Sequence, residues 1–245
     1  MDQNFSTDLT RVFFANQLEL SEEQGRLFSF LTDEMLRVNG QMNLTAVTEP
    51  REIAVKHYAD CAAIADLPKI GDTVCDIGAG AGFPTLPLAI LRPDLRITAV
   101  DSTEKRMRYV AETASLLGLE GVNTLTARAE ELGKNTEYRE AFDFVTARAV
   151  APLNILCELC LPLVSVGGRF CALKSVGGRE ELEQAKNAGA CLGASVTEVR
   201  EFFLKDPFAC MPRDALRRML IVFEKTKPTP EQYPRRYAKI QSKPL

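Results

Sequence analysis

The sequence has no apolar run that approaches the roughly 18 residues needed to cross a bilayer. Residues 1–10 are polar and acidic, and they lack the basic and apolar regions of a secretory signal. Cysteine occurs at only seven positions, an odd number with irregular spacing, which does not resemble a disulfide framework. These absences argue against a membrane partner and against a disulfide-stapled secreted protein, and we expect a protein of the reducing cytoplasm.

The sequence has only one histidine and one pair of cysteines at metal-ligand spacing. Cys157 and Cys160 have the spacing of metal ligands, but they lie in the apolar run LNILCELCLPLV and no second pair matches them. We therefore expect buried thiols on a helix, and no metal. His57 is the only histidine, and its place on the apolar side of a helix predicts a hydrogen-bonded structural role rather than catalysis.

What is present is an ordinary globular composition with an uneven charge. The 245 residues are 46% hydrophobic and 26% charged, which suits one large domain, or one domain with a small appendage. The formal net charge is −3, yet from Lys225 onward six basic residues face one acid, Glu231. A basic tail on an acidic body indicates an anionic partner, although a solvated tail that aids solubility remains an alternative.

The hydrophobic pattern divides the chain into an N-terminal helical part and a part in which strands and helices alternate. Residues up to about 67 have helical periodicity, and Ser21 followed by Gln24 is a capping box. From Gly71 short β-rich runs alternate with helical ones, which predicts an α/β fold: a mostly parallel sheet with helices on both faces and an N-terminal helical extension. We expect a helical extension at 1–67, a ligand-binding domain at 68–226 and a basic, proline-rich tail at 227–245. The strand candidates are TVCDI, RITAVD, VNTLTA, FDFVTAR, GGRFCALK, TEVREFFL and RRMLIVFEK, of which the last two are candidates for a hairpin at one edge.

Three glycines, Gly78, Gly80 and Gly82, follow the first predicted strand. In such sheets ligands sit beyond the carboxyl ends of the strands. The spacing G-x-G-x-G departs from the dinucleotide fingerprint G-x-G-x-x-G. Asp76, directly before the loop, would repel a pyrophosphate but favour a cationic ligand, by direct or water-mediated contact. S-adenosylmethionine carries an ammonium, a sulfonium and no phosphate, so it fits this loop, while a mere tight turn remains an alternative.

The next strand ends add polar groups to the same crevice. Asp101 ends the second strand, about 20 residues past the loop, where an acid can accept from ribose hydroxyls. Ala129 and Glu130 follow the third strand, within reach of an adenine, and Arg148 ends the fourth. Together these residues predict a site for S-adenosylmethionine.

The loop after the fourth strand bears on the methyl acceptor. Exocyclic amines of bases are typically methylated by enzymes with an Asn/Asp-Pro-Pro-aromatic run there, whereas this chain has ARAVAPLN. Carbon methylation of pyrimidines needs a cysteine nucleophile, and the crevice shows no Pro-Cys loop. An acceptor that already holds a lone pair remains: a purine ring nitrogen, or a small-molecule oxygen or nitrogen.

These motifs in combination resemble the ribosomal RNA small-subunit methyltransferase G family, also called glucose-inhibited division protein B. The resemblance is carried by NLTAV, DIGAGAGFPTLPLAI, VDSTEKR, ARAEE, FDFVTARAVAPL, GGRFCALK and YPRRYAKIQSKPL. It implies a Rossmann-like fold and transfer of a methyl group from S-adenosylmethionine to N7 of a guanine in 16S ribosomal RNA. It implies cofactor contacts at Gly78, Phe83, Ala129, Glu130 and Arg148.

Two residues depart from the family pattern, and several functional interpretations stay open. Ser175 and Ala238 stand where the family usually has glycine, which affects the geometry of a loop and of the tail. We expect a monomer that meets 16S RNA or the small ribosomal subunit, with phosphates contacted by Lys174, Arg235 and Arg236. The alternatives are a dinucleotide-dependent oxidoreductase, a small-molecule methyltransferase, and a non-catalytic RNA-binding protein of the same fold.

Overall fold

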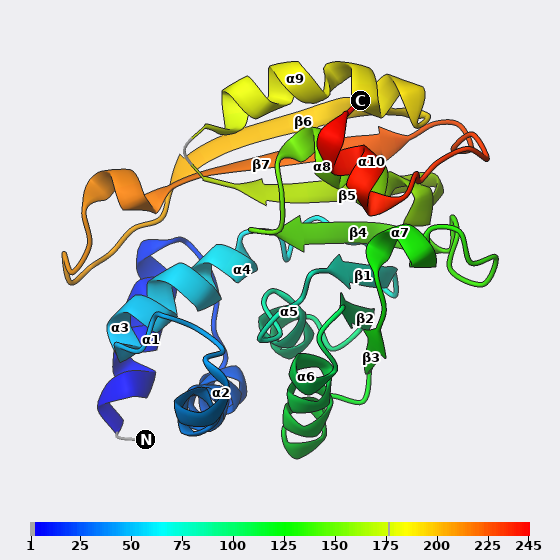
Figure 1. The fold of residues 1–245 in the computed structure, drawn as a ribbon. Helices are drawn as coiled ribbons and strands as arrows, with labels where there is room; N and C mark the ends of the chain where they lie inside the picture. Colours follow the sequence, from blue (N-terminus) through cyan, green and yellow to red (C-terminus); the bar gives the residue numbers. More distant parts are fainter. Residues whose placement is uncertain (1–2, 176) are drawn as a thin grey trace.

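The computed structural model describes residues 3–175 and 177–245 (Figure 1). Within these residues seven strands form one sheet, in the order β3-β2-β1-β4-β5-β7-β6. The strands are β1 (Thr73–Ile77), β2 (Arg96–Asp101), β3 (Val122–Thr126), β4 (Phe142–Arg148), β5 (Val164–Lys174), β6 (Ala194–Phe203) and β7 (Arg217–Lys225). Each predicted strand is therefore present, with β5 and β6 beginning three residues earlier than the sequence pattern indicated.

The sheet is parallel from β3 to β5 and antiparallel at its other side. Strand β7 pairs with β5 and β6 in antiparallel register, which confirms the hairpin at the edge. The carboxyl ends of β1, β2, β4 and β5 therefore meet along one side of the sheet, which we call the carboxyl edge. The opposite side, where these strands begin, is the amino edge. Because β7 and β6 run in opposite directions, β7 begins and β6 ends at the carboxyl edge.

Helices cover both faces of the sheet (Figure 1). Along β7, Ile221 and Phe223 pack in the core beneath α8 and α9, whereas Leu220 and Val222 pack with residues of α5 on the other face. This alternation is the period-2 pattern of a strand buried on both sides. The helices after β1 are α5 (Thr85–Leu91), α6 (Glu104–Leu116), α7 (Ala129–Leu132), α8 (Leu153–Cys160), η2 (Leu161–Leu163), α9 (Gly178–Cys191), η3 (Arg213–Leu216) and α10 (Tyr237–Ser242).

The N-terminal residues form helices that pack beside the carboxyl edge (Figure 1). They are α1 (Gln3–Ala15), α2 (Glu22–Met42), α3 (Pro50–Ile53), the π-helix η1 (Ala54–Ala59) and α4 (Asp60–Ala62). The predicted capping box at Ser21 and Gln24 starts α2. The ring of Phe28 in α2 lies 4.7 Å from that of Tyr58 in η1, so the wide π-turn is fixed by aromatic packing. This turn brings His57 and Asp60 to the carboxyl edge.

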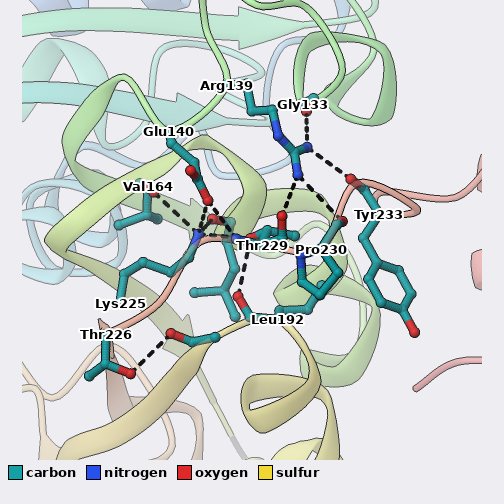
Figure 2. A network of polar contacts seen from close by, with 12 residues as sticks. Gly133, Arg139, Glu140, Val164, Leu192, Lys225, Thr226, Thr229, Pro230 and Tyr233 are labelled. Carbon is teal, nitrogen blue, oxygen red and sulfur yellow. Dashed lines mark hydrogen bonds and ion pairs between the residues drawn. The ribbon is translucent and has the colours of Figure 1, made fainter.

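The residues after β7 cross the amino edge. The Arg139 guanidinium donates to the carbonyls of Gly133, Thr229 and Tyr233 at 2.7–2.8 Å (Figure 2). The Lys225 ammonium, which is fully buried, donates to the Leu161 carbonyl at 2.7 Å. These bonds fix the tail to the loops that precede β4 and β5. Within the described ranges no helix is both long and apolar enough to span a membrane.

Candidate functional site

The three glycines form a tight loop at the end of β1. Gly78, Gly80 and Gly82 all have positive φ values (74°, 58° and 85°), which side-chain-bearing residues rarely adopt. The Gly80 amide donates to Asp101 Oδ2 at 3.1 Å, and Asp101 Oδ1 accepts from the Thr103 amide at 2.8 Å. The structure thus brings together Gly78, Gly80 and Asp101, as the sequence predicted.

The loop after β4 lies against this glycine loop. A Cβ atom at Gly78 would stand 2.4 Å from Val150 Cγ2, so only glycine fits beneath that side chain. Ala149, before Val150, has a φ of 56°, a strained value for a residue with a side chain. Residues 149–152, which we call the β4–α8 loop, therefore make up one wall of the predicted donor site.

Asp76 is fully buried beneath the loop and does not face open solvent. Its Oδ2 atom accepts from the Thr85 amide and, at 2.6 Å, from the Thr85 hydroxyl, which fixes the start of α5. Its Oδ1 atom is buried and has no hydrogen-bond partner among the described residues. Burial is the main cause that raises the pKa of Asp76 to about 6. An unpartnered buried acceptor of this kind fits a cationic group, and a carboxylate here does not fit a phosphate.

Phe83 and Arg148 lie together at the boundary between the sheet and the N-terminal helices. The Phe83 ring stacks on the His57 ring at 4.5 Å, and the Arg148 guanidinium carbon lies 5.5 Å from the Phe83 centroid. Arg148 Nη1 donates to Asp60 Oδ2 and to the Lys56 carbonyl, both at 3.1 Å. The guanidinium of Arg148 is thus directed toward the helices, and its closest link to the glycine loop is through Phe83.

His57 is held as a neutral imidazole. Its Nε2 atom lies 3.0 Å from the Thr45 hydroxyl, and its buried Nδ1 atom has no partner among the described residues. Burial, followed by the charge of Arg148, lowers the pKa of His57 to about 3. This environment agrees with the hydrogen-bonded structural role that we expected.

Ala129 and Glu130 are the first two residues of α7, directly after β3 and its short connection. The Ala127 amide donates to the Asp101 carbonyl at 3.2 Å, which keeps this connection beside the end of β2. Both residues are half-buried. Ala129 and Glu130 therefore lie at the carboxyl edge, as Asp101 does, because β2 and β3 are parallel neighbours.

An open groove of about 730 Å³ lies beyond the ends of β4 and β5. Asp60 pairs there with two arginines, with Arg148 Nη1 at 3.1 Å and with Arg218 Nε at 2.7 Å. Sequence analysis missed Asp60 and Arg218. A carboxylate inside the apolar stretch HYADCAAIA was the available signal, because a buried acid needs a cationic partner. The groove is lined by Val47, Lys56, His57, Asp60, Arg148, Ala149, Val150, Ala151, Pro152, Leu173, Lys174, Ser175, Glu181 and Arg218.

Lys174 lines the groove, and its ammonium forms an ion pair with a carboxylate of this chain. Its ammonium lies 2.7 Å from Glu181 Oε2 and donates to the Ala151 carbonyl at 2.7 Å, and its side chain is only 10% exposed. The same Glu181 oxygen accepts from the Leu153 amide at 2.7 Å. Lys174 and Glu181 thus clamp the end of the β4–α8 loop that leads into α8, and a contact of Lys174 with RNA stays a prediction.

The two tail arginines differ from each other. Arg235 donates from Nε and Nη2 to the fully buried Glu158 at 2.8 and 2.6 Å, and its side chain is 15% exposed. The charge of Arg235 is therefore paired within the protein, and its contact with RNA phosphates stays a prediction. Arg236, at the N-cap of α10, is exposed. The tail segment from Thr229 to Tyr233 is anchored at the amino edge, and α10 packs against α8, whereas the groove lies at the carboxyl edge.

Five of the seven cysteines are buried and two are exposed, and none forms a disulfide within the described residues. Cys157 and Cys160 are buried on α8, as expected, and burial raises the pKa of both thiols. Across residues 3–175 and 177–245, no three His, Cys, Asp or Glu side chains gather as metal ligands would.

Comparisons with known proteins agree with this geometry. The structure of M. jannaschii TYW2 in complex with AdoMet superposes with a TM-score of 0.52 at 17% identity, covering 68% of this chain and 74% of the other, which is a likeness of fold. A ribosomal RNA small subunit methyltransferase G from Exiguobacterium is 44% identical over 94% of this chain and 95% of its own. The relative of that name from Lactobacillus delbrueckii is 45% identical over 93% and 94%.

The profile of the GidB family, described as rRNA small subunit methyltransferase G, matches residues 24–207. That range includes the glycine loop, the strand ends with Asp101 and Arg148, and the clamp on the β4–α8 loop. Since the profile covers most of the chain and the relatives align over nearly their full length, the chain belongs to the rRNA small subunit methyltransferase G family.

Proposed function

We propose that this chain transfers a methyl group from S-adenosylmethionine to N7 of a guanine in 16S ribosomal RNA. Family membership supports the ribosomal RNA substrate, which is the substrate named for the relatives. A ribosomal substrate also supports a cytoplasmic location. The glycine loop and the groove both lie within one chain, which supports action as a monomer.

The donor is assigned to the glycine loop. Asp101 is assigned the ribose hydroxyls, and its position at the end of β2, bonded to the Gly80 amide, supports this assignment. Phe83, Ala129 and Glu130 are assigned to the adenosine and Gly78 to close backbone approach. Asp76 Oδ1 offers a buried acceptor to a cationic group. Arg148 is assigned a contact through Phe83, because its guanidinium is held by Asp60. When bound, S-adenosylmethionine supplies an activated methyl group on a sulfonium.

The observation that carries the choice of N7 is the state of His57. It is the only histidine of the chain, and its imidazole stays neutral, buried and stacked on Phe83. Guanine N7 carries no proton at neutral pH, so its methylation needs no general base. The N7 lone pair forms the new N–C bond as the C–S bond breaks, and the positive charge passes from sulfur to the base. The contribution of the protein is alignment in a shielded site.

The test uses labelled donor with small-subunit RNA and with small-subunit particles. We expect one methyl group on a guanine, and strand cleavage at that base after borohydride and aniline, because N7 methylation labilises the ring. A methyl group on an exocyclic amine or ribose oxygen, with a strand that resists cleavage, would contradict the assignment. Comparison of RNA with particles identifies which of the two is the substrate.

A further inference from the structure

A cluster of arginines surrounds an exposed aromatic ring at the carboxyl edge. We define the arginine–phenylalanine patch as Arg179, Phe203, Arg213 and Arg217 with the carboxylate Glu201. Phe203 ends β6, and Arg217 is its register partner at the start of β7. Figure 1 shows that these strand ends and the first turn of α9 lie on the same side of the molecule as the end of β4.

The charges of this patch are not balanced within it. Arg179 and Arg217 both pair with the single carboxylate of Glu201, the second at 3.1 Å. The two guanidinium groups hold the pKa of Glu201 below its usual value. Arg213 has no ion pair among the described residues, and its guanidinium carbon lies 5.2 Å from the Phe203 centroid. By contrast, Arg37 and Arg108 on other surfaces each have a carboxylate of their own.

The patch is open to solvent. The Arg179 side chain is 73% exposed, and Phe203 is 44% exposed. An exposed aromatic ring with a guanidinium above it is a platform for an unstacked base, and free guanidinium donors suit phosphate oxygens. The combination is typical of surfaces that bind single-stranded RNA.

The patch adjoins the groove through the start of α9. Arg179 lies two residues before Glu181, which lines the groove and pairs with Lys174, whereas Arg218, the neighbour of Arg217, points to the other face of β7 and pairs with Asp60. Gly178, the residue before Arg179, packs against Lys174 and Met219. A Cβ atom added at Gly178 would lie 3.4 Å from the Cβ atom of each. A strand of RNA that placed a base in the groove could therefore continue directly onto the patch.

We infer that this patch binds the nucleotides that flank the target guanine: Arg179 and Arg217 contact their phosphates, and Phe203 with Arg213 stacks on one base. The inference rests on the proposed function, because it assumes that the target base enters the groove. It places RNA recognition at the carboxyl edge, beside the donor site, and gives the amino-edge tail no part in holding these nucleotides.

The experiment compares four variants of the full-length chain in methyl transfer to small-subunit RNA, one of which is Phe203→Leu. The patch variant carries Arg179→Gln and Arg213→Gln, which leaves the pair of Arg217 with Glu201 in place. The matched control removes two paired, exposed cations elsewhere, Arg26→Gln and Lys186→Gln. The tail variant is Arg236→Gln. Donor affinity and melting temperature are measured for each.

For the patch variant we expect KM for RNA to rise about tenfold or more, with kcat at saturating RNA and donor affinity retained. The slope of log affinity against log salt should fall by about 0.7, since Arg179 is the one contact to a single-stranded phosphate that this variant removes. Phe203→Leu should raise KM without changing the salt slope. The control should match the wild type.

The inference is overturned if the patch variant keeps the wild-type KM while the wild type methylates guanine, or if Arg236→Gln raises KM more than the patch variant does. A rise in KM of the patch variant that is seen only with particles, and not with free RNA, would mean that the patch binds a ribosomal protein. That result would also overturn the inference. A wild type that methylates no guanine would instead refute the proposed function, whatever the variants do.

Discussion

The two edges of the sheet treat polar groups in opposite ways. At the amino edge, the buried Lys225 ammonium is surrounded by Glu140, the Thr229 hydroxyl and two carbonyls, and Arg139 is surrounded by carbonyls (Figure 2). At the carboxyl edge, Asp76 and His57 each keep a buried polar atom without a partner among the described residues.

The difference separates stability from chemistry within one sheet. A buried network in which every polar atom has a hydrogen-bond partner fixes a segment of chain. A buried acceptor without a partner lowers stability and is available to bind a ligand. Both edges contain arginines and carboxylates, so charge alone does not identify the functional one. We therefore expect substitutions at the amino edge to change stability with little effect on methyl transfer, and substitutions at the carboxyl edge to do the reverse.

The largest effect is expected for Lys225→Met. Removal of the ammonium takes one donor away from the Thr229 hydroxyl, two carbonyls and Glu140, which keeps only the Thr229 amide, so the free energy of unfolding should fall by about 2–4 kcal/mol. Urea unfolding measures it, and the exposed Lys186→Met on α9 should cost under about 0.5 kcal/mol as a control. Methyl transfer at a temperature where the variant stays folded should be near wild type. A folded variant without methyl-transfer activity would contradict the claim that the amino edge serves stability alone.

Asp101→Asn tests the carboxyl edge with a matched carboxylate at the other edge. Asp143, at the start of β4, accepts from the Thr73 amide much as Asp101 accepts from the Gly80 amide. Loss of a charged acceptor for ribose hydroxyls should weaken donor binding by about 1.5–3 kcal/mol in calorimetry. Asp143→Asn should leave donor affinity unchanged. Equal losses in both variants would mean that Asp101 acts only by supporting the fold, and NAD binding in place of the donor would refute the methyltransferase assignment.

Glu181→Gln sharpens the comparison within the carboxyl edge. Loss of the carboxylate frees the Lys174 ammonium and weakens the bond to the Leu153 amide, so the β4–α8 loop should leave its position beside Gly78. We expect kcat to fall roughly tenfold through misplacement of the groove wall, with a smaller change in donor affinity. Glu183→Gln, on the same helix and paired with Lys186, is the control. Restoration of kcat by Glu181→Asp would support positioning, whereas an unchanged kcat in Glu181→Gln would exclude the clamp.

Much of the fold followed from local pattern. In the sequence, β-rich runs alternate with helical ones. This pattern predicted β1, β4 and β7 with the bounds that the structure has. The family assignment, made by resemblance, is confirmed by the profile match. The division of the chain near 67 and 226 stays a prediction. Val164–Val166 escaped notice because a β-bulge opposite Phe142 and Phe144 interrupts the regular pairing of β5.

The site was less predictable, because side-chain pairing depends on contacts between distant segments. Strand-end logic correctly placed Asp101 beside Gly80, since parallel strands bring their ends together. It could not show that Lys174 is neutralised by a helix that follows it, or that Arg235 reaches a buried carboxylate on α8. Asp60 was missed for the same reason: its arginine partners lie 88 and 158 residues away.

The smallest expected effect concerns the pH dependence of stability at His57. Its pKa is about 3 in the folded protein against an ordinary value of 6.5, so between these values only the unfolded chain binds the proton. The stability that His57 contributes is complete above pH 6.5 and is lost as pH falls toward 3, by about 0.8 kcal/mol on going from pH 7.5 to about pH 6. Asp76, whose pKa is raised to about 6, acts in the opposite direction, but it is common to the wild type and His57→Gln and cancels in their difference. Because the chain has one histidine, NMR of the untagged protein should show one imidazole that does not titrate between pH 8 and pH 5. An imidazole that titrates near 6.5 would show that the ring is open to water, and would return His57 to the candidates for proton transfer at the carboxyl edge.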